Sequence, residues 1–294
     1  MILLLGGPTA SGKTEAAIAL ARGFDAEIVG ADSRQVYRGM PIGTAMPSAE
    51  QLAAVPHHLF AFLDPRERYS AARYAIDAMQ AIEDIEARGK RVIVAGGTGF
   101  YLRALAGAVE LAPQYDPVLR ERLAREVRTH PPEALHGWLA ARDPARAAAI
   151  RPSDAYRVVR GLEVTLAGKI AEDRGDGVPT LPSRGIAFAY AVLDASPEEV
   201  DARIERRVDG MLASGFVEEA ERIGEEVAAA SAVGYPFALA YLRGWSTPSE
   251  LRASLVRATR QYARRQRTWF RGERAEHVSP AALADFAREK LGWT

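Results

Sequence analysis

The chain of 294 residues contains no cysteine. This absence excludes disulfide bonds, catalysis by a thiolate and a zinc site with cysteine ligands. Long apolar runs are also missing, and the N-terminal run at residues 2–5 is far too short for a signal peptide or a membrane span. We therefore expect a cytoplasmic protein that does not enter a membrane.

An excess of charge is lacking as well. Lys+Arg and Asp+Glu both number 38, so the net charge indicates no polyanionic partner, although a basic face can be balanced by acidity elsewhere. The hydrophobic content of 48% and the charged content of 26% are typical of a globular enzyme. The length allows one large domain, or a core with a smaller attached domain.

A phosphate-binding pattern opens the chain at Gly7-Pro8-Thr9-Ala10-Ser11-Gly12-Lys13-Thr14. A predicted buried strand at residues 2–5 precedes it, and an Ala-rich predicted helix at residues 15–22 follows. Such a loop aims backbone N–H groups at one point where a helix begins, and the helix dipole favours an anion there. Lys13 adds a positive charge, and the Thr14 hydroxyl can bind a metal ion. A glycine turn that merely joins strand to helix would not require this order, so we predict that the loop binds a phosphate or diphosphate.

Predicted strands and helices alternate through much of the remaining chain. Apolar residues recur at helical spacing in the helices, and short apolar runs mark the strands. This alternation predicts an α/β protein with a parallel sheet covered on both faces. The expected elements after the first helix are strands at residues 27–32, 91–95 and 186–193 and helices at residues 71–88, 100–105, 203–212 and 217–230.

The amino-acid composition changes from about residue 113. Residues 116–166 are rich in Ala and Arg, contain prolines that punctuate helices, and include no convincing strand. Residues 168–183 carry the Gly, Asp and Pro of a linker. We expect a core domain at residues 1–112 and 184–294, and a helical insertion with its linker at residues 113–183.

Three further features sit near predicted strand ends. Asp32 ends the second strand, and it should lie near the phosphate loop because ligands collect at the carboxyl ends of parallel strands. The glycines at residues 96–99 indicate either ligand contact or tight packing of a helix on a strand. His57 and His58 are adjacent in sequence, so they seldom reach one metal ion, and a structural or surface role is favoured.

An arginine-rich segment lies near the end of the chain. Between Arg252 and Arg274 there are eight arginines and a single acidic residue, Glu273. Spacings of three and four predict one helical stripe of Arg257, Arg260, Arg264, Arg267 and Arg271. The opposite side can dock on the core through Leu255, Tyr262 and Trp269. A solvated face is the alternative, but such faces mix signs, so we favour a contact surface for a nucleic-acid backbone.

Eight ordered segments, spread over nearly the whole chain, carry a family resemblance. They are Gly7 to Thr14, Asp32-Ser33-Arg34-Gln35-Val36-Tyr37, Gly39-Met40-Pro41-Ile42-Gly43-Thr44-Ala45, Pro56-His57-His58, Tyr69-Ser70-Ala71, Gly96-Gly97-Thr98-Gly99-Phe100-Tyr101, Arg203-Ile204-Glu205-Arg206-Arg207 and Thr259-Arg260-Gln261-Tyr262-Ala263-Arg264-Arg265-Gln266. The series resembles the tRNA dimethylallyltransferase family. This family has a P-loop NTPase-like parallel sheet with an inserted helical domain. It transfers a dimethylallyl group from dimethylallyl diphosphate to N6 of the tRNA adenosine immediately 3′ to the anticodon.

The resemblance implies roles for individual residues. Asp32 would be the base that removes the proton of the adenine amine. Lys13, Thr9 and Arg207 would bind the diphosphate, and Mg²⁺ would be held through Thr14. Without the resemblance, Arg207 would read as a surface ion pair with nearby Glu205.

RNA contacts are implied in the same way. Asp32, Ser33, Arg34, Gln35 and Thr98 would contact the target base, which must leave the anticodon stack. Further RNA contacts would come from Arg120, Tyr156, Arg157, Val158, Val159 and Arg160. On spacing rather than on the resemblance, Arg257, Arg260 and Arg264 of the stripe are expected to contact the RNA as well. Arg157 and Arg160 share one helical face, which suits phosphate contact. We expect a monomer that binds the anticodon stem-loop of tRNA.

The chain departs from the family pattern at residues 229–236, where a longer segment and a basic residue are usual and Pro236 follows Gly234-Tyr235. This leaves RNA contact by residues 233–236 open. The strongest rival is a P-loop small-molecule or nucleotide kinase, which has the same loop and sheet. It lacks an explanation for the arginine stripe. A non-catalytic RNA-binding module is a third possibility, but it has no need of an intact phosphate loop.

Overall fold

The computed structural model describes residues 1–109, 111, 117–171, 177–225 and 227–294. The chain forms two compact units, one of residues 1–109 and 179–294 and the other of residues 110–178. The sequence led us to expect residues 113–183 for the smaller unit, and position 113 itself lies outside the described residues.

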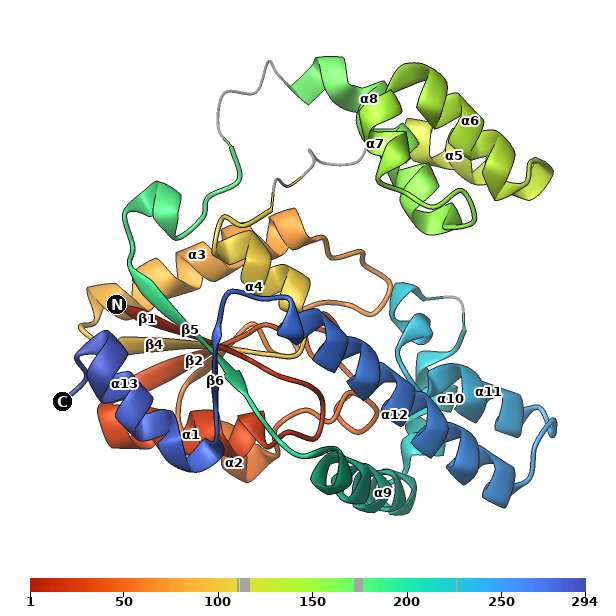
Figure 1. The fold of residues 1–294 in the computed structure, drawn as a ribbon. Coiled ribbons are helices and arrows are strands. Elements are labelled where there is room, and N and C mark those ends of the chain that lie inside the picture. Colours follow the sequence, from red (N-terminus) through yellow and green to blue (C-terminus); the bar gives the residue numbers. More distant parts are fainter. Residues whose placement is uncertain (110, 112–116, 172–176, 226) are drawn as a thin grey trace. The chain divides into compact units, whose positions relative to one another are not determined.

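A six-stranded parallel sheet forms the centre of the larger unit (Figure 1). Its strand order is β3-β2-β4-β1-β5-β6, and every neighbouring pair is parallel. The five residues of β1 are all buried, as expected of a strand covered on both faces. The predicted α/β sheet is therefore confirmed. The strands are β1 (Ile2–Gly6), β2 (Ala26–Gly30), β3 (His57–His58), β4 (Arg91–Ala95), β5 (Phe188–Leu193) and β6 (Glu276–Val278).

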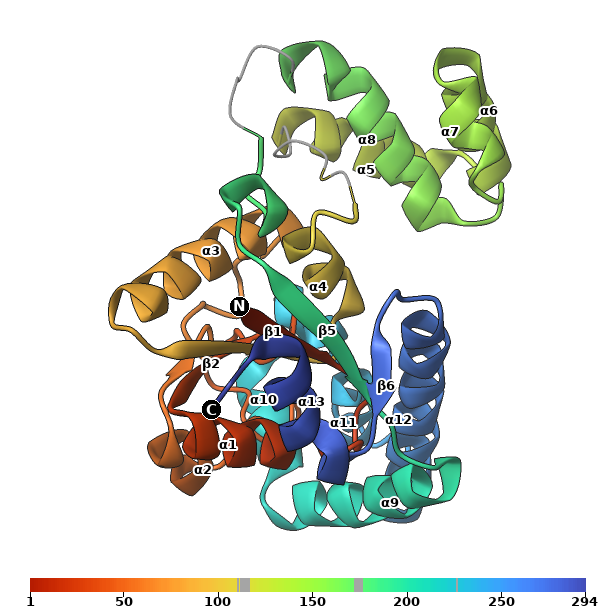
Figure 2. The same cartoon turned by 60° about the vertical axis from the view of Figure 1, so that its left-hand side comes forward.

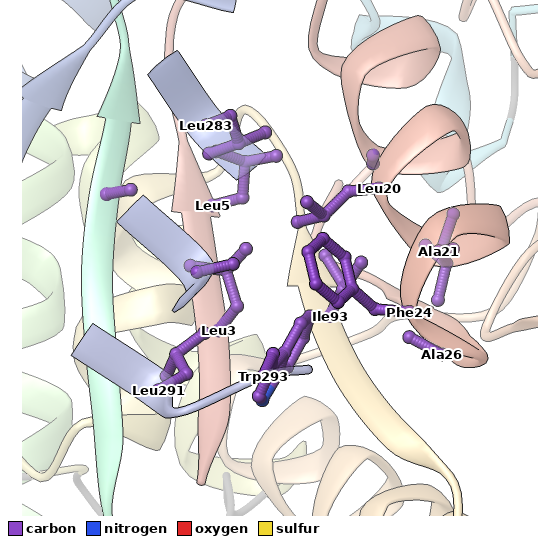
Figure 3. Packing of buried hydrophobic residues seen from close by; sticks show 14 of the residues in the cluster. Leu3, Leu5, Leu20, Ala21, Phe24, Ala26, Ile93, Leu283, Leu291 and Trp293 are labelled. Atoms are coloured by element: carbon purple, nitrogen blue, oxygen red, sulfur yellow. The ribbon is translucent and has the colours of Figure 1, made fainter. Parts of the chain in front are cut away.

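Helices pack on both faces of this sheet. Helices α1 (Lys13–Phe24) and α13 (Leu283–Leu291) lie together on one face, and α3 (Ala71–Ala87) and α4 (Gly99–Leu105) lie on the other (Figures 1 and 2). Figure 3 shows the first interface, where Leu3 and Leu5 meet side chains of α1 and α13. Burying such a side chain contributes about 1.5–3 kcal/mol. This core fixes the loop that links β1 to α1.

Four more helices gather near the carboxyl ends of the strands (Figure 2). They are α9 (Pro197–Ala213), α10 (Phe216–Ile223), α11 (Tyr235–Leu242) and α12 (Pro248–Arg271). Their apolar residues share one core with Ala10, Val36 and Met40, which belong to the loops after β1 and β2. The site loops are thus sandwiched between sheet and helices. Short elements complete the unit: α2 (Ala49–Ala54), η1 (Pro182–Arg184), η2 (Ala228–Ser231) and η3 (Pro280–Ala282).

Two expected elements need correction, and other elements were not expected at all. The helix predicted at residues 217–230 stops at Ile223, because Gly224 adopts a φ of 70° that ends it. The linker predicted from residue 168 begins later, since a helix continues to residue 171. Strand β6 and helix α13 were not predicted, because the three residues of β6 are largely polar and exposed and give no apolar run.

The described residues of the smaller unit form helices joined by short turns and include no strand. Its core is formed by Leu123, Leu135, Leu139, Ala147, Val158 and Leu162. A side chain at Gly161 would come within 2.7 Å of Leu139, so this glycine permits two helices to approach closely. The helices are α5 (Pro117–Thr129), α6 (Pro132–Arg142), α7 (Pro144–Ala148) and α8 (Ala155–Ala171). None of the helices in the described ranges of the chain is long and apolar enough to cross a bilayer.

Candidate active site

The phosphate loop connects β1 to α1 and is shaped by left-handed residues. Gly12 has a φ of 90° and Ala10 has a φ of 62°. Gly12 caps α1 without a side-chain hydrogen bond to the first-turn amides, so these N–H groups remain available to an anion. A side chain at Gly7 would come within 3.0 Å of the Leu193 carbonyl oxygen. Glycine at this position therefore allows the loop to lie close to the end of β5. The local geometry is that of an anion cradle.

Lys13 supplies the cation of this cradle. Its Nζ donates a hydrogen bond to the Pro8 carbonyl oxygen at 2.6 Å. Removal from water lowers the pKa of Lys13 to about 7, and nearby Asp32 opposes this effect while Arg207 adds to it. An arriving diphosphate would favour the charged lysine, so binding of the anion and uptake of a proton are coupled.

This coupling predicts a pH dependence of diphosphate binding. Below pH 7 Lys13 is already protonated in the free site, whereas above pH 7 a proton must be taken up with the ligand. Affinity for a prenyl diphosphate should therefore fall by up to about tenfold per pH unit above pH 7. Calorimetry at pH 8 in buffers of different ionisation enthalpy should show proton uptake, and Lys13→Arg should abolish it. Equal proton uptake in both proteins would contradict this assignment.

Helices α9 and α12 hold the loop from the other side. Arg207 Nη1 donates to Thr9 Oγ1 at 2.8 Å, and Arg203 Nη1 donates to the Ala10 carbonyl oxygen at 3.3 Å. Gln266 Oε1 accepts a bond from the Thr9 N–H at 2.8 Å, and its Nε2 donates to the Gly97 carbonyl oxygen at 2.8 Å. Burial lowers the pKa of Arg207, partly offset by Glu15 and Asp32. Arg207 therefore faces the loop.

Two of these residues were missed as individual site residues. Arg203 and Gln266 lie inside segments that carried the family resemblance, but one arginine among many and one glutamine on a basic helix gave no separate signal. Glu205, the suspected partner of Arg207, instead accepts a bond from Arg260 at 2.6 Å. The simple surface ion pair is thus not what the structure contains.

Asp32 follows β2 and caps its own turn. Its Oδ1 accepts the N–H of Arg34 at 2.8 Å and the N–H of Gln35 at 3.4 Å. Thr98 Oγ1 accepts the N–H of Ser33 at 3.0 Å, which joins the ends of β2 and β4. The carboxylate is therefore fixed by the backbone on one oxygen.

The glycines after β4 are required by close packing. A side chain at Gly96 would come within 2.0 Å of the Ala31 carbonyl oxygen. One at Gly97 would come within 2.5 Å of Gln266 Nε2, and one at Gly99 within 2.1 Å of Trp269. The packing interpretation of these glycines is confirmed, and the first two also line the cavity described next.

One cavity of about 370 Å³ is lined by all four predicted catalytic residues, by the phosphate loop from Thr9 to Thr14 and by the residues that follow β2. Lys13, Asp32 and Arg207 all line it, so the anion cradle and the carboxylate face the same space. Thr98 is not among the lining residues, but its hydroxyl oxygen accepts the N–H of Ser33, which does line the cavity. The other lining residues include Thr9 to Gly12, Thr14, Ser33 to Gln35, Gly43 to Ala45, Ser231 to Gly234, Tyr262, Arg265 and Gln266.

A Mg²⁺ ion at Thr14 is compatible with this donor set. Thr14 lines the cavity beside Lys13, and no group of three His, Cys, Asp or Glu residues suited to a metal occurs among the described residues. A magnesium ion there would be held by the Thr14 hydroxyl, diphosphate oxygens and water, because Mg²⁺ in proteins usually takes few protein ligands and keeps several waters. A ring nitrogen of His57 lies 2.7 Å from the Val55 carbonyl oxygen, and one of His58 lies 2.7 Å from a Glu27 carboxylate oxygen, so both rings have structural partners. His57 also lines the cavity.

The arginine stripe lies on α12. Arg257 and Arg264 are exposed, whereas Arg260 is paired with Asp201 at 3.4 Å and Glu205 at 2.6 Å from α9. The side opposite the stripe docks as expected, with Leu255 buried and Tyr262 at the cavity. The positive charge of the stripe is therefore partly neutralised at Arg260 by two carboxylates of α9, although the sequence of α12 itself suggested a uniformly positive surface.

The predicted RNA contacts of the smaller unit differ in exposure. Tyr156 is 75% exposed and Arg157 is exposed, but the Val158 side chain is fully buried in the helical core, which assigns it to packing. Arg120 and Arg160 both pair with the buried Glu163, at 3.3 Å and 2.9 Å. This carboxylate holds the two guanidinium groups together.

Comparisons with known proteins agree on one family. Residues 35–273 match the family model described as IPP transferase. The tRNA dimethylallyltransferase of Anaeromyxobacter dehalogenans is 47% identical over an alignment of 292 positions, and the alignment covers 96% of this chain and 97% of that protein. That of Alkalilimnicola ehrlichii is 44% identical over 99% of this chain and 94% of its own length.

A solved structure supports the same conclusion. The full-length tRNA isopentenylpyrophosphate transferase from Bacillus halodurans superposes with a TM-score of 0.70 and is 33% identical, covering 99% of this chain and 96% of its own. The fold and nearly the full length of the chain are thus shared with proteins of one family. The chain belongs to the IPP transferase family, the family of the tRNA dimethylallyltransferases.

Proposed function

We propose that the protein transfers a dimethylallyl group from dimethylallyl diphosphate to N6 of the adenosine 3′ to the tRNA anticodon, A37. The products are N6-isopentenyladenosine and diphosphate. The observation that carries this proposal is the cavity that Asp32 shares with Lys13 and Arg207 of the anion cradle. Family membership supports it, since the relatives named above act on tRNA.

The chemistry needs both halves of the cavity. An adenine amine is a poor nucleophile because its lone pair is delocalised into the ring. Asp32 removes the amine proton as the C–N bond forms, a contribution of about 10²–10⁴-fold. As the C–O bond to the diphosphate breaks, the loop N–H groups, Lys13 and Arg207 stabilise the departing charge. A bound Mg²⁺ would neutralise part of the charge on the same group.

The acceptor enters from RNA. The base leaves the anticodon stack, which is easier in a loop than in a duplex, and lies against Ser33, Arg34 and Gln35. Arg257 and Arg264 of α12 are exposed, as is Arg157 of the helical unit, and this exposure supports the proposal that they contact RNA phosphates. We take the acting unit to be a monomer, because one chain supplies both the carboxylate and the cradle. We propose that it acts in the cytoplasm.

A direct assay tests this function against the kinase alternative. The protein is incubated with labelled dimethylallyl diphosphate and unmodified tRNA, and the nucleosides are then separated. Label in a prenylated adenosine supports the proposal. A parallel reaction with ATP in which phosphoryl transfer occurs and no prenylated nucleoside appears would overturn it and favour the kinase.

The exposed part of the stripe should bind the RNA backbone. Reversing Arg264 to glutamate removes one cation and adds an anion, so tRNA affinity should fall, and its dependence on salt should become flatter by about one unit of slope. Arg264 suits this test better than Arg260, whose reversal would set like charges against Asp201 and Glu205. Arg22→Glu, at an exposed position of α1, is the matched control. A loss confined to diphosphate affinity would contradict this role.

A further inference from the structure

The loop of residues 39–47 forms one wall of the reaction cavity, and a buried carboxylate from α10 holds it. Gly43, Thr44 and Ala45 line the cavity. Glu219 is 0% exposed, its Oε2 accepts the N–H of Ile42 at 2.9 Å, and its Oε1 accepts the N–H of Gly43 at 2.7 Å. The loop is thus anchored through its backbone at the point where it reaches the cavity.

Tyr235 completes the environment of this carboxylate. Its hydroxyl donates to Glu219 Oε1 at 2.7 Å. Burial, and then the bond to Glu219, raise the pKa of Tyr235, so the hydroxyl keeps its proton and remains a donor. Three donors therefore satisfy a carboxylate that would be unfavourable in this apolar core without them.

The anchored loop supports a residue of the acceptor side. Gln35 Nε2 donates to the carbonyl oxygens of Thr44 at 3.1 Å and Ala45 at 3.0 Å. The backbone N–H of Gln35 is also one of the two donors to Asp32 Oδ1. A continuous series of hydrogen bonds thus runs from Glu219 through the loop to Gln35 and Asp32.

Packing alone does not explain an acidic residue here. A side chain at Gly43 would come within 2.5 Å of both Phe216 and the Tyr235 hydroxyl, so the loop is already pressed against α10 and α11. An apolar side chain at position 219 could fill the same space, but it would leave the N–H groups of Ile42 and Gly43 unpaired. The carboxylate fits the task of fixing two backbone donors at defined positions.

We propose that Glu219 is a positioning residue for the acceptor base of the transfer reaction. It sets the cavity wall at residues 42–45 and, through Gln35, the side of the cavity next to Asp32. It does not touch the anion cradle, which is held by Arg203, Arg207 and Gln266. The proposal rests on the assignment of this cavity to the tRNA adenosine.

The variant Glu219→Gln tests the proposal. One carboxylate oxygen becomes an NH₂ group, which then faces a backbone or hydroxyl donor, and two hydrogen bonds to the loop cannot both persist. We expect the KM for an anticodon stem-loop to rise by about tenfold or more and kcat to fall, with little change in the Kd of dimethylallyl diphosphate. Hydrogen exchange at the amides of Ile42 and Gly43 should become faster.

Two matched variants sharpen the test. Glu218→Gln changes an exposed carboxylate on the same turn of α10. It should leave the KM for the stem-loop, kcat and the Kd of dimethylallyl diphosphate unchanged. Tyr235→Phe removes one donor but keeps both backbone bonds, so its effect should be smaller than that of Glu219→Gln. Circular dichroism and thermal melting establish that each variant is folded.

The outcomes separate this inference from the proposed function. A folded Glu219→Gln protein with unchanged KM, kcat and amide exchange refutes the positioning role and leaves the function intact. Equal losses of diphosphate affinity and stem-loop affinity would also refute it, since they indicate general loosening. Wild-type protein without prenyl transfer would refute the proposed function, and this inference with it.

Discussion

Replacing Asp32 with alanine should lower turnover by about 10²–10⁴-fold, while affinity for dimethylallyl diphosphate stays nearly unchanged. The reason is that the carboxylate is assigned to the proton of the incoming amine, whereas the diphosphate is held by the loop between β1 and α1. Pre-steady-state transfer from labelled donor to an anticodon stem-loop measures the first quantity, and calorimetry measures the second.

The isosteric variant Asp32→Asn makes this prediction sharper. An asparagine can keep the hydrogen bonds that Oδ1 accepts from the N–H groups of Arg34 and Gln35, so the turn should persist. It lacks a basic oxygen, so its turnover should fall about as far as that of the alanine variant. Nearly normal turnover of Asp32→Asn would remove Asp32 from the role of base and leave it a structural cap.

Removing the cation at position 207 should produce the second large effect. Arg207→Gln is expected to lower kcat/KM by about 10²–10³-fold, because a donor aimed at the departing diphosphate is lost together with the bond to Thr9 Oγ1. Affinity for the diphosphate product should weaken in parallel. Steady-state kinetics and product inhibition measure the two effects.

The neighbouring arginine provides a control of the same chemistry. Arg206 is exposed on the same helix, so Arg206→Gln should change kcat/KM very little. Comparable losses in the two variants would show that the general positive charge of α9 matters, rather than the contact of Arg207 with the loop.

The sequence predicted the parts of the fold that have strong local patterns. Strands β1, β2, β4 and β5 are apolar runs next to glycine turns or long helices, and each lies within about two residues of its expected bounds. The second strand was expected to end at Asp32, but β2 ends at Gly30. Strand β6 was not predicted because it is an edge strand whose residues are mostly exposed. The pattern of apolar residues identifies buried strands but gives little signal for exposed ones. The end of α10 depended on one glycine conformation.

The site was predictable where a motif fixes local geometry. The cradle and Asp32 belong to consecutive strand–loop units of a parallel sheet, whose ends must meet at one edge. Gln266 and Glu219 were not predictable in the same way, because each acts through contacts with residues more than 160 positions away in sequence. The pairing of Arg260 with two carboxylates of α9 likewise required the packing of α12 on α9.

Three bare α-carbons, Gly96, Gly97 and Gly99, set the spacing at the catalytic edge of the sheet. A single methyl group on the first would wedge the β4 turn away from Ala31, the residue just before the reactive carboxylate. We expect the protein to keep its hydrophobic core of apolar strands and still lose its activity, because Asp32 and the diphosphate would no longer lie in the same cavity.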